Sequence, residues 1–271
     1  MATNQAQRDR WNAESQATTW PRRERITTPV TPLLLEALAL RSGESVLDVG
    51  CGGGLSSMEA ARAVAPSGAV TGFDLSTPLV RLATQRAAEA KIDNARFVAG
   101  DAQTDAIPGG PFDAVMSQFG VMFFADPVAA FSNIRKHVRA GGRMAFVCWQ
   151  SAAKNVWYPG PVLAKYAPPP PATEHGGPPP GPFAFGDAVY VKRVLAGAGF
   201  QDVTFEEFTL DVAVAEDSII DRETAEGLKL DAARTAQAWA DLQAFRAPMI
   251  KDDGLVHLTL APQIVQARNP G

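Results

Sequence analysis

Residues 46–54, V-L-D-V-G-C-G-G-G, place three glycines at alternating positions directly after a short apolar segment. Residues 46–49 are typical of a buried strand, and the alanine-rich residues 55–64 are typical of a helix. The glycines therefore lie in a strand-to-helix turn. Glycine allows positive φ there and removes the Cβ that would keep a ligand from the backbone, while free N–H groups at the helix start favour an anionic group. We predict that this turn binds a ligand.

Further strands are predicted after this turn, with helices between them. The strands cover residues 69–74, 95–99, 112–117 and 143–149, and the helices cover roughly 78–91 and 127–139. Such alternation predicts a doubly wound α/β fold, in which the C-terminal ends of the parallel strands share one edge. Asp74, Asp101 and the Ser117-Gln118 turn each follow one of these strands. We therefore expect all three beside the glycine turn, where ligands bind in such folds.

The glycine spacing separates two ligand classes. A dinucleotide-binding turn, G-x-G-x-x-G, would need a third glycine where this chain has Leu55. The stretch D-V-G-C-G-G-G instead resembles the first motif of class I S-adenosylmethionine-dependent methyltransferases. The stretches G-F-D-L-S, F-D-A-V-M-S-Q-F-G-V-M-F-F-A-D-P and A-G-G-R-M-A-F-V-C-W resemble further motifs of that family. The chain is most similar to the ubiquinone/menaquinone-biosynthesis-like branch, which methylates small molecules.

This resemblance implies a Rossmann-like, seven-stranded, mostly parallel sheet of order 3-2-1-4-5-7-6, with the last strand antiparallel. It also implies S-adenosylmethionine as the cofactor. Asp74 can accept hydrogen bonds from the ribose diol, Asp101 can accept one from the adenine amino group, and the Gly52 carbonyl can accept one from the ammonium. A helix cap for Asp74 and a turn residue for Asp101 are the alternatives. The expected cofactor-binding residues are Gly50, Cys51, Gly52, Gly54, Asp74, Leu75, Asp101, Ala102, Gln118 and Trp20.

The remaining chain is expected to cover and complete this core. We predict an N-terminal lid segment at 1–32, a cofactor-binding core at 33–150, a Pro/Gly-rich cap insertion at 151–186, a core helix and strand at 187–211, a helical cap at 212–250, and a closing core strand at 251–271. The two proline runs of the insertion exclude a central strand or helix there. The cap as a whole is therefore expected to be mainly helical.

Acceptor-binding residues are harder to predict from pattern. Trp11, Phe119, Met122 and Arg22 are the candidates, although Phe119 and Met122 are equally typical of a core. Arg22 and Arg23 could bind an anionic acceptor, or could belong to a solvated helix face. His175, in the cap insertion, is the one histidine that we consider as a catalytic base, with a surface role as the alternative.

Composition limits the partners and the location. A net charge of −4 argues against a nucleic-acid partner, and no apolar run approaches the roughly 18 residues of a membrane span. Cys51 and Cys148 have no zinc-ligand spacing, so no metal is expected. The polar start without a signal core predicts a cytoplasmic protein. A homodimer is compatible with this sequence.

The predicted activity is methyl transfer from S-adenosylmethionine to a small organic acceptor by in-line displacement. Positioning and exclusion of water would provide most of the rate enhancement. Three alternatives stay open at this point: other chemistry on S-adenosylmethionine, such as cyclisation of its amino acid end, a nicotinamide-dependent reductase, and a binding protein without catalysis.

Overall fold

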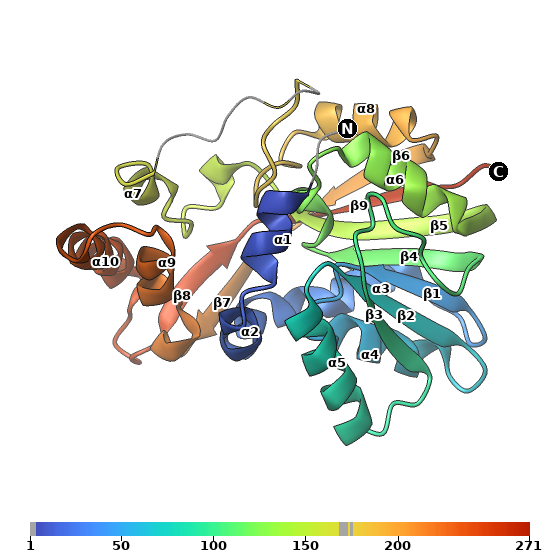
Figure 1. Ribbon diagram of the computed structural model, residues 1–271, viewed down its shortest axis with the longest axis horizontal. Helices are drawn as coiled ribbons and strands as arrows, with labels where there is room; N and C mark the ends of the chain where they lie inside the picture. Colours follow the sequence, from blue (N-terminus) through green and yellow to red (C-terminus); the bar gives the residue numbers. More distant parts are fainter. Residues whose placement is uncertain (1–3, 168–172, 174–175) are drawn as a thin grey trace.

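A twisted seven-stranded sheet forms the centre of the protein (Figure 1). The computed structural model describes residues 4–167, 173 and 176–271. The sheet order is β3-β2-β1-β4-β5-β9-β6, and β9 alone runs antiparallel to its neighbours. The strands are β1 (Ser45–Val49), β2 (Ala69–Asp74), β3 (Ala95–Ala99), β4 (Phe112–Gln118), β5 (Val138–Trp149), β6 (Gln201–Glu207) and β9 (Pro262–Arg268). The predicted doubly wound sheet and its strand order are confirmed.

Helices cover both faces of this sheet because successive strand residues point to opposite sides. Val46 of β1 packs in one apolar cluster with α3 and α4, whereas the next residue, Leu47, packs in another with α6 and α8. These helices are α3 (Thr31–Leu38), α4 (Leu55–Val64), α6 (Pro127–Lys136) and α8 (Ala188–Gly197), and α5 (Thr77–Glu89) packs on β2 and β3. Near-continuous burial of β1 and β4 follows from this coverage.

The cap lies at the left of Figure 1, and the buried residues of its hairpin pack in the same apolar cluster as the core. It contains α7 (Gly160–Leu163), α9 (Asp221–Gly227), α10 (Ala232–Arg246), and a hairpin of β7 (Leu210–Val214) and β8 (Val256–Leu260). Val162, Ala225 and Leu242 form its own apolar cluster. Beside that cluster, the almost fully buried Arg246 pairs with Asp221 through two hydrogen bonds of 3.1 Å.

The structure differs from the sequence interpretation where the chain enters and leaves the cap. The expected helical segment 212–250 begins within strand β7, and part of the expected closing strand, β8, pairs with β7 outside the main sheet. Alternate residues of both strands are buried, so two half-apolar strands stabilise each other as a hairpin. Pro262 then starts β9, which returns to the main sheet.

Two glycines bring the turn after β1 against the turn after β4. A Cβ on Gly50 would lie 2.7 Å from the Cα of Gly120, and a Cβ on Gly120 would lie 2.7 Å from the Val49 carbonyl oxygen. Backbone atoms cannot move aside as a flexible side chain does. Only residues without side chains fit at this contact, which sets the spacing of the two turns.

We predict that Gly120→Ala lowers the free energy of unfolding by about 1–3 kcal/mol, because the added methyl overlaps the backbone of the glycine turn. Urea denaturation followed by circular dichroism measures this. Gly227→Ala in α9 is the matched control, since its Cβ would meet no atom within 4 Å. Equal stability of Gly120→Ala and the wild type would contradict the proposed role of this contact.

Candidate functional site

A cavity of about 240 Å³ lies at the edge where the strand C-termini meet the N-terminal helices. Its walls come from the glycine turn, from the ends of β2, β3 and β4, and from α1 (Gln5–Trp11) and α2 (Ser15–Thr27). The expected site residues that line it are Gly50, Cys51, Asp74, Leu75, Asp101, Ala102, Gln118, Trp20, Trp11, Phe119 and Met122. The topology therefore brings Asp74, Asp101 and Gln118 to one cavity beside the glycine turn, at the edge to which the strand pattern assigned them.

Gly52 and Gly54 shape the glycine turn without lining the cavity. Gly50, Gly52 and Gly54 all have positive φ, and Gly54 precedes α4 in the left-handed conformation. The indole of Trp20 lies directly against Gly52, in the space that a Cβ there would fill. The turn expected to receive a ligand is therefore covered by a side chain of the lid segment.

Asp74 connects the glycine turn to the start of α5. Its carboxylate accepts hydrogen bonds from the backbone N–H of Gly52 and of Ser76, each at 2.8 Å. Burial raises the pKa of Asp74, and these two hydrogen bonds oppose the rise. The cap of α5 is Ser76, whose Oγ accepts from Leu79 N, so Asp74 does not have the alternative capping role. Each carboxylate oxygen keeps a further lone pair for a ligand.

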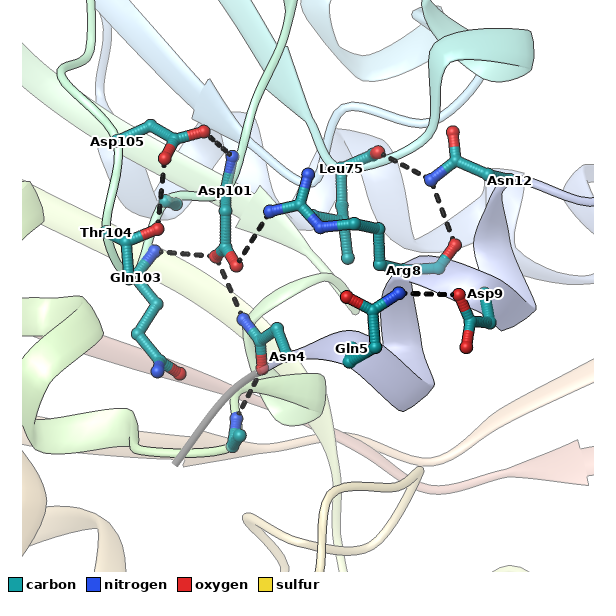
Figure 2. A network of polar contacts seen from close by, with 12 residues as sticks. Asn4, Gln5, Arg8, Asp9, Asn12, Leu75, Asp101, Gln103, Thr104 and Asp105 are labelled. Carbon is teal, nitrogen blue, oxygen red and sulfur yellow. Dashed lines mark hydrogen bonds and ion pairs between the residues drawn. The ribbon is translucent and has the colours of Figure 1, made fainter. Parts of the chain in front are cut away.

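Asp101 is contacted by the first helix of the chain (Figure 2). Asn4 donates to its carboxylate at 2.9 Å, and Arg8 approaches the other oxygen at 3.5 Å. Gln103 N also donates to the same carboxylate at 2.9 Å, which is the bond expected of a turn residue. Asp101 is thus both a turn residue and a polar group at the cavity wall.

Polar residues on one face of α1 were not recognised in the sequence. Asn12 donates to the Leu75 carbonyl at 3.1 Å and accepts from Thr77 N at 3.0 Å, and Asn4 and Arg8 bind Asp101 (Figure 2). These three residues are spaced four apart, so they share a helix face. This spacing of polar residues was the sequence signal that could have identified the face. It predicts that one side of α1 binds polar groups at the edge of the sheet.

Hydrogen bonds and a partly buried ion pair hold α2 over the glycine turn. Glu24 accepts from the Trp20 indole N–H at 2.6 Å and pairs with Arg86 of α5 at 2.8 Å. Arg86 also donates to the Gly53 carbonyl at 3.0 Å. Burial raises the pKa of Glu24, while the charge of Arg86 acts in the opposite direction. This pair is largely shielded from solvent, so it positions Trp20 more firmly than an exposed ion pair would.

The expected acceptor side of the cavity is aromatic. Phe119 follows β4 with φ of 61°, an uncommon value for a residue with a bulky side chain, and stacks on Trp149 at a centroid distance of 4.1 Å. Trp11 meets Phe123 edge-on at 5.3 Å, and Met122 is buried. Strained backbone of this kind is concentrated at functional sites.

Besides Gly52 and Gly54, the expected site residue Arg22 does not line the cavity. Arg22 binds Glu223 and the backbone carbonyls of Asp217 and Ile219, so its guanidinium holds the lid segment to the cap. Arg23, its neighbour, lines the cavity instead. His175, expected as the candidate base, lies outside the described residues.

Asp48 lies beneath the site as a buried acid. One carboxylate oxygen accepts from Ser56 Oγ at 2.8 Å and Ser57 Oγ at 2.6 Å, while the other has no hydrogen-bond partner among the described residues. Burial raises the pKa of Asp48 from 3.8 to about 6, and the two serine hydrogen bonds oppose this rise.

Residues 46–142 match the family model described as Methyltransferase domain. That range contains the glycine turn, Asp74, Asp101 and Phe119. The matched range is therefore similar to a methyltransferase domain. The sheet order is the one that the resemblance to class I S-adenosylmethionine-dependent methyltransferases implied.

Curated relatives match less than half of this chain. Aklanonic acid methyltransferase DauC of Streptomyces sp. (strain C5) is 34% identical over 119 residues, which are 44% of this chain and 54% of that protein. Nocamycin O-methyltransferase of Saccharothrix syringae is 35% identical over 116 residues, 43% of this chain and 41% of that protein. The chain thus spans about half the length of these relatives. They do not specify the ubiquinone/menaquinone-like branch.

Solved structures share the fold. A putative methyltransferase (BH2331) of Bacillus halodurans matches with a TM-score of 0.57 and 19% identity, over 89% of this chain and 99% of that one. A SAM-dependent methyltransferase of Aquifex aeolicus matches with a TM-score of 0.56 and 15% identity, over 95% and 98% of the two chains. In the described part of this chain, no helix is long and apolar enough to cross a membrane, and no cluster of metal-binding side chains is found.

The pKa of Asp48 predicts a pH dependence of stability. Folding favours the protonated acid, so its contribution is fully present below about pH 4 and is lost as pH rises through about 6. A shift of about two units corresponds to about 3 kcal/mol. We expect the stability of the wild type relative to Asp48→Asn to fall by about 1–3 kcal/mol between about pH 4 and about pH 7. Urea denaturation at several pH values measures this, and a pH-independent difference would contradict it.

Proposed function

We propose that the protein transfers a methyl group from S-adenosylmethionine to a small organic acceptor. The observation that carries this proposal is the convergence of Asp74, Asp101 and Gln118 on one cavity beside the glycine turn, within the range that matches a methyltransferase domain. Each side chain comes from the end of a different strand. The glycine spacing, without a glycine at Leu55, favours this cofactor over a dinucleotide.

The residues present fit the chemistry of the cofactor. Asp74 has lone pairs available for a ribose diol, and Asp101 offers an acceptor for an adenine amino group beside the apolar Ala102. Bound S-adenosylmethionine would supply a methyl group on a positively charged sulfur. Buried carboxylates at the rim favour that charge. Trp20 covers Gly52, so ligand entry into the glycine turn requires a shift of α2.

The chain's own contribution to catalysis is then positioning and exclusion of water. Phe119 and Trp149 form an apolar wall beside the end of β4, and α1 and α2 close the opposite side. Of the described residues that line the cavity, none is a histidine. An acceptor that arrives already deprotonated needs no general base. The names of the relatives, one of them an O-methyltransferase, favour an oxygen nucleophile.

Several finer predictions accompany this proposal. The cytoplasmic location, the absence of a nucleic-acid partner and the homodimer all rest on composition. The division into lid segment, core and cap, and the roles of the individual site residues, rest on motif and geometry.

A product assay tests the proposed reaction. Purified protein is incubated with methyl-labelled S-adenosylmethionine and a panel of aromatic acids and phenols, and products are separated by mass. We expect labelled acceptor and S-adenosylhomocysteine in equal amounts. Formation of methylthioadenosine instead would indicate cyclisation of the amino acid end, and tight binding of NADH without binding of S-adenosylmethionine would indicate a reductase.

We predict that Asp74→Ala weakens the binding of S-adenosylhomocysteine by about 1–3 kcal/mol, because the ribose hydroxyl groups lose the acceptor proposed for them. Isothermal titration calorimetry measures the affinity. Asp74→Asn keeps the shape and one acceptor, so a smaller loss is expected. Asp93→Ala, at an exposed position outside the cavity, is the control. Unchanged affinity in Asp74→Ala would remove this residue from the site.

A further inference from the structure

We propose that Arg10 and Arg23 form a binding site for an anionic group of the acceptor, so that the substrate is a flat, largely apolar acid. This inference rests on the proposed function and names the class of its substrate. It is carried by Arg23 at the cavity wall, whose Nε has no hydrogen-bond partner among the described residues, by a second arginine beside the same indole, and by the aromatic side chains of the cavity wall.

Arg23 is the first of these residues. It is half-buried and lines the cavity, and its Nε is buried without a hydrogen-bond partner among the described residues. Its neighbours on α2 behave differently, since Arg22 binds Glu223 and Arg25 binds Asp217 at 2.8 Å. A buried donor without a partner is costly unless a ligand satisfies it.

Arg10 brings a second positive charge to the same place. The guanidinium carbons of Arg10 and Arg23 lie 5.3 Å and 5.9 Å from the centroid of the Trp11 ring, and Arg10 is also 5.9 Å from that of Phe123. Across the described residues, the side chain of Arg10 has no carboxylate partner. Burial and the nearby charge of Arg10 lower the pKa of Arg23 to about 10, while Glu223 opposes this.

Arginine side chains are charged at neutral pH. These two lie beside the same indole, and neither has a carboxylate partner among the described residues. The acid whose charge acts on Arg23, Glu223, is already bound to Arg22. Two cations in this arrangement repel each other, and an anion between them removes that repulsion. Guanidinium groups bind carboxylates through paired N–H donors, which suits a carboxylate or an ionised enol better than a neutral amide.

The aromatic series gives the shape of the acceptor's body. Phe119 stacks on Trp149, Trp149 meets Trp157 at 5.0 Å, Trp157 meets Tyr158 at 6.1 Å, and Tyr158 meets Phe183 at 4.9 Å. Of these residues, Phe119 and Trp149 line the cavity. Burial raises the pKa of Tyr158, and the charge of Arg10 acts against that rise. Aromatic faces and edges of this kind bind flat apolar molecules.

The first test uses the wild-type protein and two probes of matched size, the anion 2-naphthoate and the neutral 2-naphthamide. Quenching of tryptophan fluorescence measures their affinities in low-salt buffer, with and without S-adenosylhomocysteine. We expect the carboxylate to bind about tenfold more tightly or better, since two charge-assisted contacts replace neutral ones. Equal affinities, or no measurable binding of 2-naphthoate, would overturn the proposal without any variant being made.

Variants then assign the preference to the pair. Arg23→Met and Arg10→Met keep much of the side-chain bulk, and each is expected to weaken 2-naphthoate binding about tenfold while changing 2-naphthamide binding less than about twofold. Arg62→Met is the charge-matched control, because Arg62 lies in the last turn of α4 and pairs with Glu59. An equal loss for both probes in Arg23→Met and Arg10→Met would show a structural role and overturn the proposal.

Cofactor titration on the same preparations separates this inference from the proposed function. Preference for the carboxylate with no binding of S-adenosylmethionine would leave the anion site standing and would contradict methyl transfer. Binding of S-adenosylmethionine with no preference between the probes would leave methyl transfer standing and would overturn the anion site.

Discussion

The buried carboxylate of Asp74 holds the site together. It accepts from Gly52 N in the turn after β1 and from Ser76 N at the start of α5, so one side chain sets the distance between two segments that line the cavity. The close backbone contact of Gly50 with Gly120 sets a second distance, to the turn after β4. Together they determine the rim on which every other site residue is placed. Both contacts depend on parallel strands ending at one edge.

The N-terminal helices contact the same groups that we propose as cofactor-binding. Asn4 and Arg8 bind Asp101, and Trp20 covers Gly52. These contacts satisfy buried polar groups when no ligand is bound, which avoids the cost of leaving them unpaired. A ligand that binds these groups replaces the contacts of Asn4, Arg8 and Trp20 with its own. Its affinity then depends on the difference in free energy between the two sets of contacts. The N-terminal segment is fastened to α5 by Glu24 and Arg86 and to the cap by Arg22.

Much of the core was predictable because its signals are local. Alternating strands and helices, the glycine spacing and the carboxylates at strand ends each depend on a few neighbouring residues. The cap was less predictable. Its apolar spacing indicated helices, but the pairing of β7 with β8 joins residues more than forty positions apart and depends on which faces meet. The polar face of α1 was missed because its partners, Leu75, Thr77 and Asp101, lie far along the chain.

The sequence by itself determined the doubly wound sheet, the glycine turn and the edge at which the site lies. Tertiary structure decided which basic residues face the cavity. Arg22, Arg23 and Arg25 lie within four residues of sequence, but successive helix residues point about 100° apart, so the rotation of α2 gives each arginine a different environment. That rotation is set by Trp20 against Gly52 and by Arg22 and Arg25 against the cap. With α2 held in this way, Arg23 lies at the cavity wall. Which face of the helix is turned toward the cavity depends on tertiary contacts, and no local sequence pattern shows it.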